Sequence, residues 1–291
     1  MDTMTIANND IVIEAWNTVL FDKLTRYKHL VTALSSHSDE AIRRHPPASD
    51  ARVLDVGSGF GDSAIFTAQK AAPGGEVIGV DCARNMVKTA TDDAKSAGVK
   101  NVSFFAADAQ LDDLRGPYDY AFSRFGTMFF MSPGAALGNI RRALKPGGKF
   151  VQVVWRIRED NPWLFEAEQR VSDIVPVISH EETDEVHCGP GPFSFAGADM
   201  VSSMLCGVGY DEVTFERFDN DICIGKDIDD AVEFAMDLGP AGEIIRLAGD
   251  EGERLRPAVI AALQDVLKPY LQDNGVWAPS SVWFITARNP A

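Results

Sequence analysis

The strongest constraint on the fold is an alternation of short apolar runs with amphipathic segments across residues 52–155. The apolar runs begin with Arg52–Val56 and have the composition of strands that are buried on both faces. The expected strands are 52–56, 77–80, 102–105, 118–122 and 150–155, and the expected helices between them are 62–72, 84–97 and 133–144. This rhythm predicts an α/β fold with a mostly parallel sheet and helices on both faces.

Three other segments do not follow the rhythm, and additions of this kind are expected to cover a site on the sheet. The predicted parts are an N-terminal helical cap (1–50), a core (51–155), a lid insertion (156–195) and a C-terminal part of the sheet (196–291) with a helical insertion (227–275). The expected helices in these parts are 11–34, 162–175, 198–205, 227–238 and 251–271, and the expected strands are 213–218 and 281–287. A long loop is expected over 176–192.

Charge and cysteine content exclude several classes of partner. The 43 acidic and 27 basic side chains give a formal charge of −16, which argues against nucleic acid and against an anionic membrane surface. Residues 1–10 are too polar for a signal peptide, and no apolar run approaches the roughly 20 residues of a membrane span. The four cysteines (Cys82, Cys188, Cys206 and Cys223) show no metal-ligand spacing, so we expect free thiols, no metal and a cytoplasmic location.

A glycine-rich loop follows the first predicted strand. The order Gly57-Ser58-Gly59-Phe60-Gly61 lets the backbone approach a ligand, and the helix that follows directs its amide dipole toward it. Dinucleotide folds need Gly-x-Gly-x-x-Gly, a spacing that this loop lacks. Asp55, two residues before the first glycine, would repel pyrophosphate, so a positively charged cofactor is expected.

Two further acids follow the next two strands. Asp81 ends the second strand, where a carboxylate can accept both hydroxyls of a ribose, and Asp108 follows the third, where it can take the amino group of adenine. Together with Asp55, these two acids predict a ligand that combines a nucleoside with a positively charged group. An NAD-type oxidoreductase on a Rossmann-like fold, or a non-catalytic binding protein, remains the alternative.

The chain resembles the class I S-adenosylmethionine-dependent methyltransferases over residues 50–155. The matching pieces are Val53–Gly61, Gly79–Asp81, Ala107–Ala109 and Leu144–Gly148. The resemblance implies a Rossmann-like, seven-stranded, mostly parallel sheet whose last strand (281–287) runs antiparallel between its neighbours. It also implies S-adenosyl-L-methionine as cofactor, bound across the ends of the first and fourth strands.

Roles for individual residues follow from the resemblance. It implies that Asp55 faces the methionine part of the cofactor together with the glycine loop (Gly57, Ser58 and Gly59), and that the fourth strand end at Ser123 contacts the same part. It implies that Asp81 holds the ribose, while Asp108 and the amide of Ala109 hold the adenine. It places Cys82 and Met86 beside the adenine ring, with ordinary packing as the other interpretation.

The segment after the fourth strand, with Asn161-Pro162-Trp163, looks like a small-molecule subgroup related to quinone biosynthesis. The quinone enzymes usually carry Asn-x-Arg-Asn before the Pro-Gly-Gly turn, whereas this chain has Leu137–Arg142 there, which argues against a quinone ring as acceptor. The expected function is in-line transfer of a methyl group to N, O or C of a small, partly apolar acceptor. A homo-oligomer is left open.

Residues for the acceptor are predicted from their places on strand ends and covering segments. The candidates are Trp16, Tyr27, Arg124, Phe125, Phe129, Trp155 and Trp163. The aromatic ones could attract a cation or simply pack in the core. Arg124 could bind a substrate carboxylate or pair with an acid such as Asp160. The five histidines (His29, His37, His45, His180 and His187) are expected at the surface, so no general base is identified.

Overall fold

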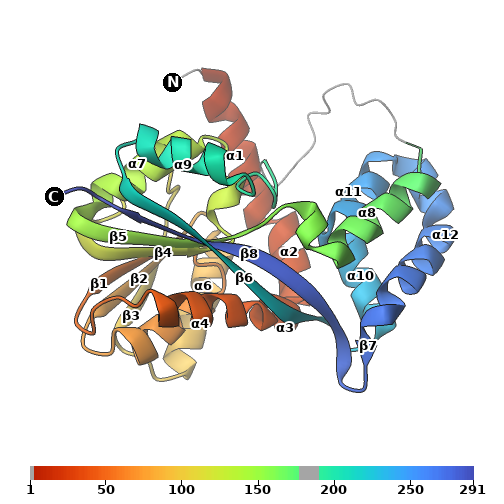
Figure 1. Ribbon diagram of the computed structural model, residues 1–291, viewed down its shortest axis with the longest axis horizontal. Coiled ribbons are helices and arrows are strands. Elements are labelled where there is room, and N and C mark those ends of the chain that lie inside the picture. The colour runs from red at the N-terminus through yellow and green to blue at the C-terminus, as the bar shows by residue number, and fades with distance from the viewer. Residues whose placement is uncertain (1–2, 177–189) are drawn as a thin grey trace.

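The computed structural model describes residues 3–176 and 190–291 (Figure 1). Its strands are β1 (Arg52–Val56), β2 (Glu76–Asp81), β3 (Val102–Ala106), β4 (Tyr118–Arg124), β5 (Leu144–Trp155), β6 (Asp211–Gly225), β7 (Leu271–Gln272) and β8 (Gly275–Arg288). They form one sheet in the order β3-β2-β1-β4-β5-β8-β6, with the two-residue β7 paired to the start of β8. The strands β1 to β5 are parallel, and β8 runs antiparallel between β5 and β6. The predicted fold class is therefore confirmed.

The strand order creates a switch point at the centre of the sheet. The chain proceeds from β1 outward through β2 and β3, then returns and continues outward on the other side through β4 and β5. Because the connections leave β1 and β4 in opposite directions, a crevice opens at the carboxyl ends of these two strands. Buried side chains such as Leu54 and Phe122 fill the sheet interior below it.

Helices cover both faces of the sheet. The helices within and beside the core are α5 (Asp62–Phe66), continued by the π-helical turn η1 (Thr67–Ala71), α6 (Arg84–Ser96), α7 (Pro133–Ala143) and α9 (Ala198–Gly207). Helices α7 and α9 lie on one side of the sheet, and α6 lies on the other (Figure 1). These helices lie close to their predicted bounds.

The N-terminal cap differs from the single helix predicted over 11–34. Four short helices follow one another instead: α1 (Thr3–Asn17), α2 (Val19–Arg26), α3 (Lys28–Ala33) and α4 (Ser35–Arg44). The backbone leaves helical geometry at Thr18 (φ −125°, ψ −97°) and changes direction again at Tyr27. The apolar spacing is helical throughout, but the side chains meet different layers, since α1 contacts α6 whereas α4 contacts β5 and β6. The spacing of apolar residues along the sequence does not reveal such bends between helices.

Two insertions that are far apart in the sequence form one unit. Helix α8 (Pro162–Ile174) packs against α11 (Pro240–Leu247) and α12 (Gly249–Leu267), and α10 (Ile228–Leu238) packs against the same two helices beside the sheet. We call these four helices the covering bundle (Figure 1). Helix α11 was not predicted, because Gly239-Pro240 resembles a break, whereas proline here occupies the first turn of a new helix. Strands β6 and β8 are longer than predicted because they extend beyond the sheet as a two-stranded ribbon toward the bundle.

Several expectations fall on residues 177–189, which lie outside the described part of the chain. These are most of the predicted loop, Cys188, His180 and His187. Among the described residues, Cys82, Cys206 and Cys223 are free thiols, and no group of three or more His, Cys, Asp or Glu side chains could hold a metal ion. No helix within residues 3–176 and 190–291 is long and apolar enough to cross a membrane.

Candidate active site

A cavity of about 880 Å³ lies at the carboxyl ends of the central strands. Its floor comes from the loops after β1, β2, β3 and β4, and its cover comes from α1, α2 and the covering bundle. The position matches the switch point of the sheet, where open α/β folds bind their ligands. A cavity of this size accommodates a cofactor together with a small second ligand.

The glycine loop forms the centre of the floor. Gly57 has φ +67°, and a Cβ atom at this position would lie 3.0 Å from Cα of Gly126, so the ends of β1 and β4 approach as closely as they do only because both residues are glycine. Gly59 also has a positive φ (+53°), and its N–H donates to Oδ2 of Asp81 at 2.8 Å. The loop is thus folded around a carboxylate of the neighbouring strand.

Asp81 and Asp108 both line the cavity, at the ends of neighbouring strands. Asp81 accepts hydrogen bonds from the N–H groups of Gly59 and Ala83, which hold the carboxylate in place, while burial raises its pKa. Asp108 accepts from the N–H of Gln110 at 2.9 Å and from Nδ2 of Asn9 at 2.6 Å. Since a carboxylate accepts about four hydrogen bonds, both acids retain lone pairs for a ligand.

The structure separates the predicted cofactor residues into two groups. The residues that line the cavity are Gly57, Ser58, Gly59, Asp81, Cys82, Met86, Asp108 and Ala109. Asp55 and Ser123 do not line it. Asp55 is buried beneath the loop, where it accepts from the hydroxyl of Ser63 at 2.6 Å, and burial raises its pKa to about 7. Ser123 donates its hydroxyl to the carbonyl of Val56 at 2.7 Å and ties β4 to β1.

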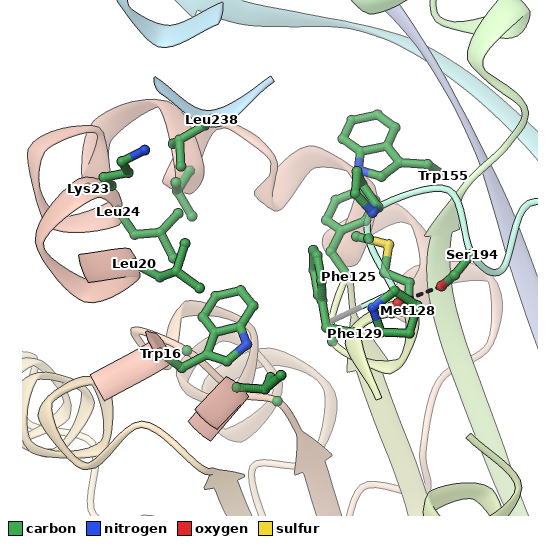
Figure 2. A pocket seen from close by; sticks show the side chains of 18 of the residues that line it. Trp16, Leu20, Lys23, Leu24, Phe125, Met128, Phe129, Trp155, Ser194 and Leu238 are labelled. Atoms are coloured by element: carbon green, nitrogen blue, oxygen red, sulfur yellow. Dashed lines mark hydrogen bonds between the residues drawn. The ribbon is translucent and has the colours of Figure 1, made fainter. Parts of the chain in front are cut away.

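Aromatic residues form one wall of the cavity, which we call the aromatic wall (Phe125, Phe129 and Trp155; Figure 2). The ring of Phe125 stacks on Trp155 with centroids 4.5 Å apart, and Trp16 meets Phe129 edge-on at 5.1 Å. Phe125 has φ 56°, a conformation that costs a side-chain-bearing residue about 1–3 kcal/mol and is concentrated at functional sites. Trp163, from α8, also lines the cavity and stacks on Phe234.

Arg124 and Tyr27 were predicted to contact the acceptor, but both side chains bind acids of the protein instead. Arg124 lines the cavity, but its guanidinium forms a bidentate ion pair with Asp62, at 2.6 and 3.0 Å, and its side chain is only 9% exposed. Of the two alternatives, pairing with an acid is the one observed, but the acid is Asp62 and not Asp160, which pairs with Arg156. Tyr27 does not line this cavity. Its hydroxyl donates to Asp237 at 2.8 Å, and burial raises its pKa.

The expectation that every histidine is at the surface is wrong for His37. Its side chain is fully buried, with Nε2 2.8 Å from the hydroxyl of Ser280 and the rings of Phe125 and Trp155 against it. Burial lowers its pKa to about 4, so the ring is neutral at pH 7. It supports the aromatic wall from behind and does not line the cavity.

Apart from Trp16, sequence reasoning missed the residues that reach the cavity from the cap and from α10. Asn9 contacts Asp108 from α1, and Leu20, Lys23 and Leu24 of α2, together with Leu238 of α10, form a second wall opposite the aromatic wall, which we call the α2 wall (Figure 2). The spacing of Leu20 and Leu24 by one helical turn was a signal of an apolar face. Nothing in the sequence indicated which element that face would meet.

Comparison with known proteins shows what the core is similar to. Residues 47–188 match a family described as a methyltransferase domain. The chain is 37% identical over 114 residues to demethylmenaquinone methyltransferase of Thermus thermophilus, a match that covers 39% of this chain and 49% of that protein. It is 27% identical over 155 residues to the Lactococcus lactis enzyme of the same name, covering 51% and 60%. The chain therefore spans about half the length of the curated relatives it matches first.

Solved structures extend the similarity of fold to nearly the whole chain. The YcgJ protein of Bacillus subtilis is 18% identical with a TM-score of 0.53, covering 89% of this chain and 99% of that one. Phosphoethanolamine N-methyltransferase 2 of Haemonchus contortus, in complex with S-adenosyl-L-methionine, is 19% identical with a TM-score of 0.52, covering 88% and 53%. Residues 47–188 thus match a methyltransferase domain, and nearly the whole chain is similar in fold to these two structures.

Proposed function

We propose that the chain transfers a methyl group from S-adenosyl-L-methionine to a small, partly apolar acceptor. The observation that carries this proposal is the placement of Asp81 and Asp108 around the glycine loop in one cavity. An acid after each of two neighbouring strands suits the ribose hydroxyls and the adenine amino group of a nucleoside. The match of residues 47–188 to a methyltransferase domain supports the same activity.

The residues of the cavity fit this cofactor. Ser58 lines the cavity, and its hydroxyl is buried with no hydrogen-bond partner among the described residues, which leaves a polar group beside the cavity unsatisfied. Asp81 would hold the ribose, Asp108 and Ala109 the adenine, and the loop at Gly57 and Ser58 the methionine part. The bound cofactor would supply an electrophilic methyl group on a positively charged sulfur.

The remaining residues would orient the acceptor and exclude water. Methyl transfer requires the nucleophile about 3–3.5 Å from the methyl carbon and in line with the sulfur. The aromatic wall, with Trp16 and Trp163, offers flat apolar surfaces for this purpose, and aromatic faces also favour a nearby sulfonium. The cap lies outside residues 47–188, so the acceptor named for the curated relatives is not carried over to this chain.

Calorimetry with S-adenosyl-L-methionine tests the proposal. We expect the wild type to bind it and Asp81→Ala to lose at least about tenfold in affinity, because a charge-assisted hydrogen bond to the ribose is lost. Asp92→Ala is the matched control, since Asp92 is an exposed acid on α6 that pairs only with Lys88 among the described residues. Absence of binding to the wild type, or equal affinity in Asp81→Ala, would refute the proposal.

Two measurements separate the competing functions. Titration with NADH, followed by its fluorescence, should give no signal, and a signal would favour the oxidoreductase. A screen for labelled methyl transfer to amines, phenols and carboxylates should give turnover, which a non-catalytic binding protein would not. The cytoplasmic location, the oligomeric state and the absence of a nucleic-acid partner stay predictions.

A further inference from the structure

We propose that Lys23 binds a carboxylate of the acceptor, so that the acceptor is a mainly apolar monoanion. The inference rests on the proposed function, because it concerns the part of the cavity next to the proposed cofactor site. It assigns to Lys23 the role that the sequence suggested for Arg124.

The other charged residues around this part of the cavity already have charged partners. Arg124 pairs with Asp62, Arg158 pairs with Glu168 at 2.7 Å, and Arg246 pairs with Glu243 at 2.8 Å. Asp237 pairs with Arg26 at 3.1 Å and also accepts from Tyr27. Each of these charged side chains therefore already has an oppositely charged partner within the protein.

Lys23 is different. Its Nζ donates to the backbone carbonyl of Asp237 at 3.1 Å, and among the described residues it forms no ion pair with a carboxylate. An ammonium group has three N–H donors, so this single bond leaves donors and the positive charge for another group. The side chain is half-buried at the edge of the cavity. Bulk water screens a charge there less than at an open surface, so the attraction between the ammonium group and an anion is stronger.

The surroundings of Lys23 define the rest of the ligand. On the α2 wall it lies among Leu20, Leu24 and Leu238, and the aromatic wall faces it across the cavity (Figure 2). A molecule that places an anion at Nζ therefore lays an apolar body between leucine and aromatic side chains. Burial of that body contributes about 25 cal/mol per Å², and the ion pair orients it.

The single lysine favours a carboxylate over a phosphate. Phosphate groups are usually bound by several donors, and arginine forks serve best because they form paired hydrogen bonds. The three arginines on this cavity (Arg124, Arg158 and Arg246) are each paired with an acid. One ammonium group matches one negative charge.

A matched pair of probes tests the inference. We would titrate 2-naphthoate and its neutral analogue 2-naphthamide into the protein saturated with S-adenosylhomocysteine, by calorimetry. The wild type should bind the naphthoate at least about tenfold more tightly, the difference expected for one charge-assisted hydrogen bond. Lys23→Met should remove this preference and leave the affinity for 2-naphthamide unchanged, which also shows that the cavity is intact. Lys23→Arg should retain most of the preference.

The control is Lys88→Met, which removes an exposed lysine of α6 and should change neither affinity. The inference is overturned if the wild type binds neither probe, if it binds both equally, or if Lys23→Met weakens both to the same extent. In the last case Lys23 only fastens α2 to Asp237. Tighter, Lys23-dependent binding of 2-naphthyl phosphate would overturn the choice of a carboxylate. A separate titration of S-adenosylhomocysteine tests the proposed function. If S-adenosylhomocysteine does not bind but naphthoate binding still depends on Lys23, the proposed function is contradicted and the inference about Lys23 is not.

Discussion

The core and its covering helices build the two halves of the cavity in different ways. In the core, the proposed cofactor half comes from short loops that follow consecutive strands, and its polar groups are held by backbone N–H groups, as Asp81 is by Gly59 and Ala83. The proposed acceptor half combines the aromatic wall of the core with residues of the cap and the covering bundle, which are distant in the sequence. The cofactor half is therefore encoded locally, whereas the acceptor half exists only after the helices have assembled.

The two regions also differ in how they are fastened. The ends of β1 and β4 are joined by close backbone contact and buried hydrogen bonds such as Ser123 to Val56. The α2 helix is fastened to the covering bundle mainly through Asp237, which accepts bonds from Lys23, Arg26 and Tyr27. A few partly exposed bonds at one residue let such a segment open separately from the core.

The largest expected effect concerns the backbone of the core. Gly57→Ala should abolish cofactor binding and lower the free energy of unfolding, because it adds about 1–2 kcal/mol of left-handed strain and pushes a Cβ atom against Cα of Gly126. Gly59→Ala is the matched variant, since its φ is also positive but its Cβ would meet nothing within 4 Å. Thermal unfolding and calorimetry compare the two. Equal losses would show that strain alone, and not the close approach of the two strands, limits this site.

An intermediate effect concerns the buried acid of the core. The pKa of Asp55 is raised to about 7 by burial, so the folded protein holds this proton more tightly than the unfolded chain does. Its contribution to stability is complete below the unfolded pKa of about 4 and is lost as the pH rises through 7. Relative to Asp55→Asn, the wild type should lose up to about 1.4 kcal/mol of unfolding free energy per pH unit within that window.

Urea unfolding of both proteins between pH 4 and 8 measures this difference. Asp119→Asn is a control with the opposite sign, because the hydrogen bond from Lys145 lowers the pKa of Asp119, and its contribution is lost as the pH falls. If the free energy of unfolding changes with pH in the same way for the wild type and for Asp55→Asn, then Asp55 is ionised in the folded protein.

The smallest expected effect concerns the fastening of the cover. Tyr27→Phe removes the hydroxyl bond to Asp237 and keeps the ring, so it should cost about 1 kcal/mol in the local opening of α2. Hydrogen exchange should then become faster in α2 and stay unchanged in β1. Faster exchange in β1 as well would show that cap and core unfold together, which would remove the distinction between the two regions.

Much of the core was predictable because its signals are local. The buried strands 52–56 and 77–80 precede glycines and acids in a fixed order, and parallel strands bring their carboxyl ends to one edge. Asp55 illustrates where this reasoning stops. A strand sends alternate side chains to opposite faces, and Asp55 meets Ser63 of α5 beneath the loop rather than the cavity.

Contacts between distant segments were not predictable in the same way. Asp160 was one possible partner of Arg124, but the guanidinium pairs with Asp62, whose helix begins right after the glycine loop. The residues next to His37 in the sequence are mostly polar, as in an exposed helix, yet the fold buries His37 behind Phe125 and Trp155. Which partner a charged or aromatic side chain meets depends on long-range packing that no local pattern contains.

The sequence by itself determined the parallel strands of the core and the glycine loop on the floor of the cavity, because strand alternation and glycine spacing act over a few residues. The antiparallel last strand was implied only by the resemblance to a known family. Only the tertiary structure decided that the α2 wall faces the aromatic wall across the cavity, that Arg124 pairs with Asp62, and that Lys23 has no carboxylate partner among the described residues. The physical reason is that these properties depend on the packing of helices from distant segments, and apolar periodicity specifies that a helix face is buried but not what buries it.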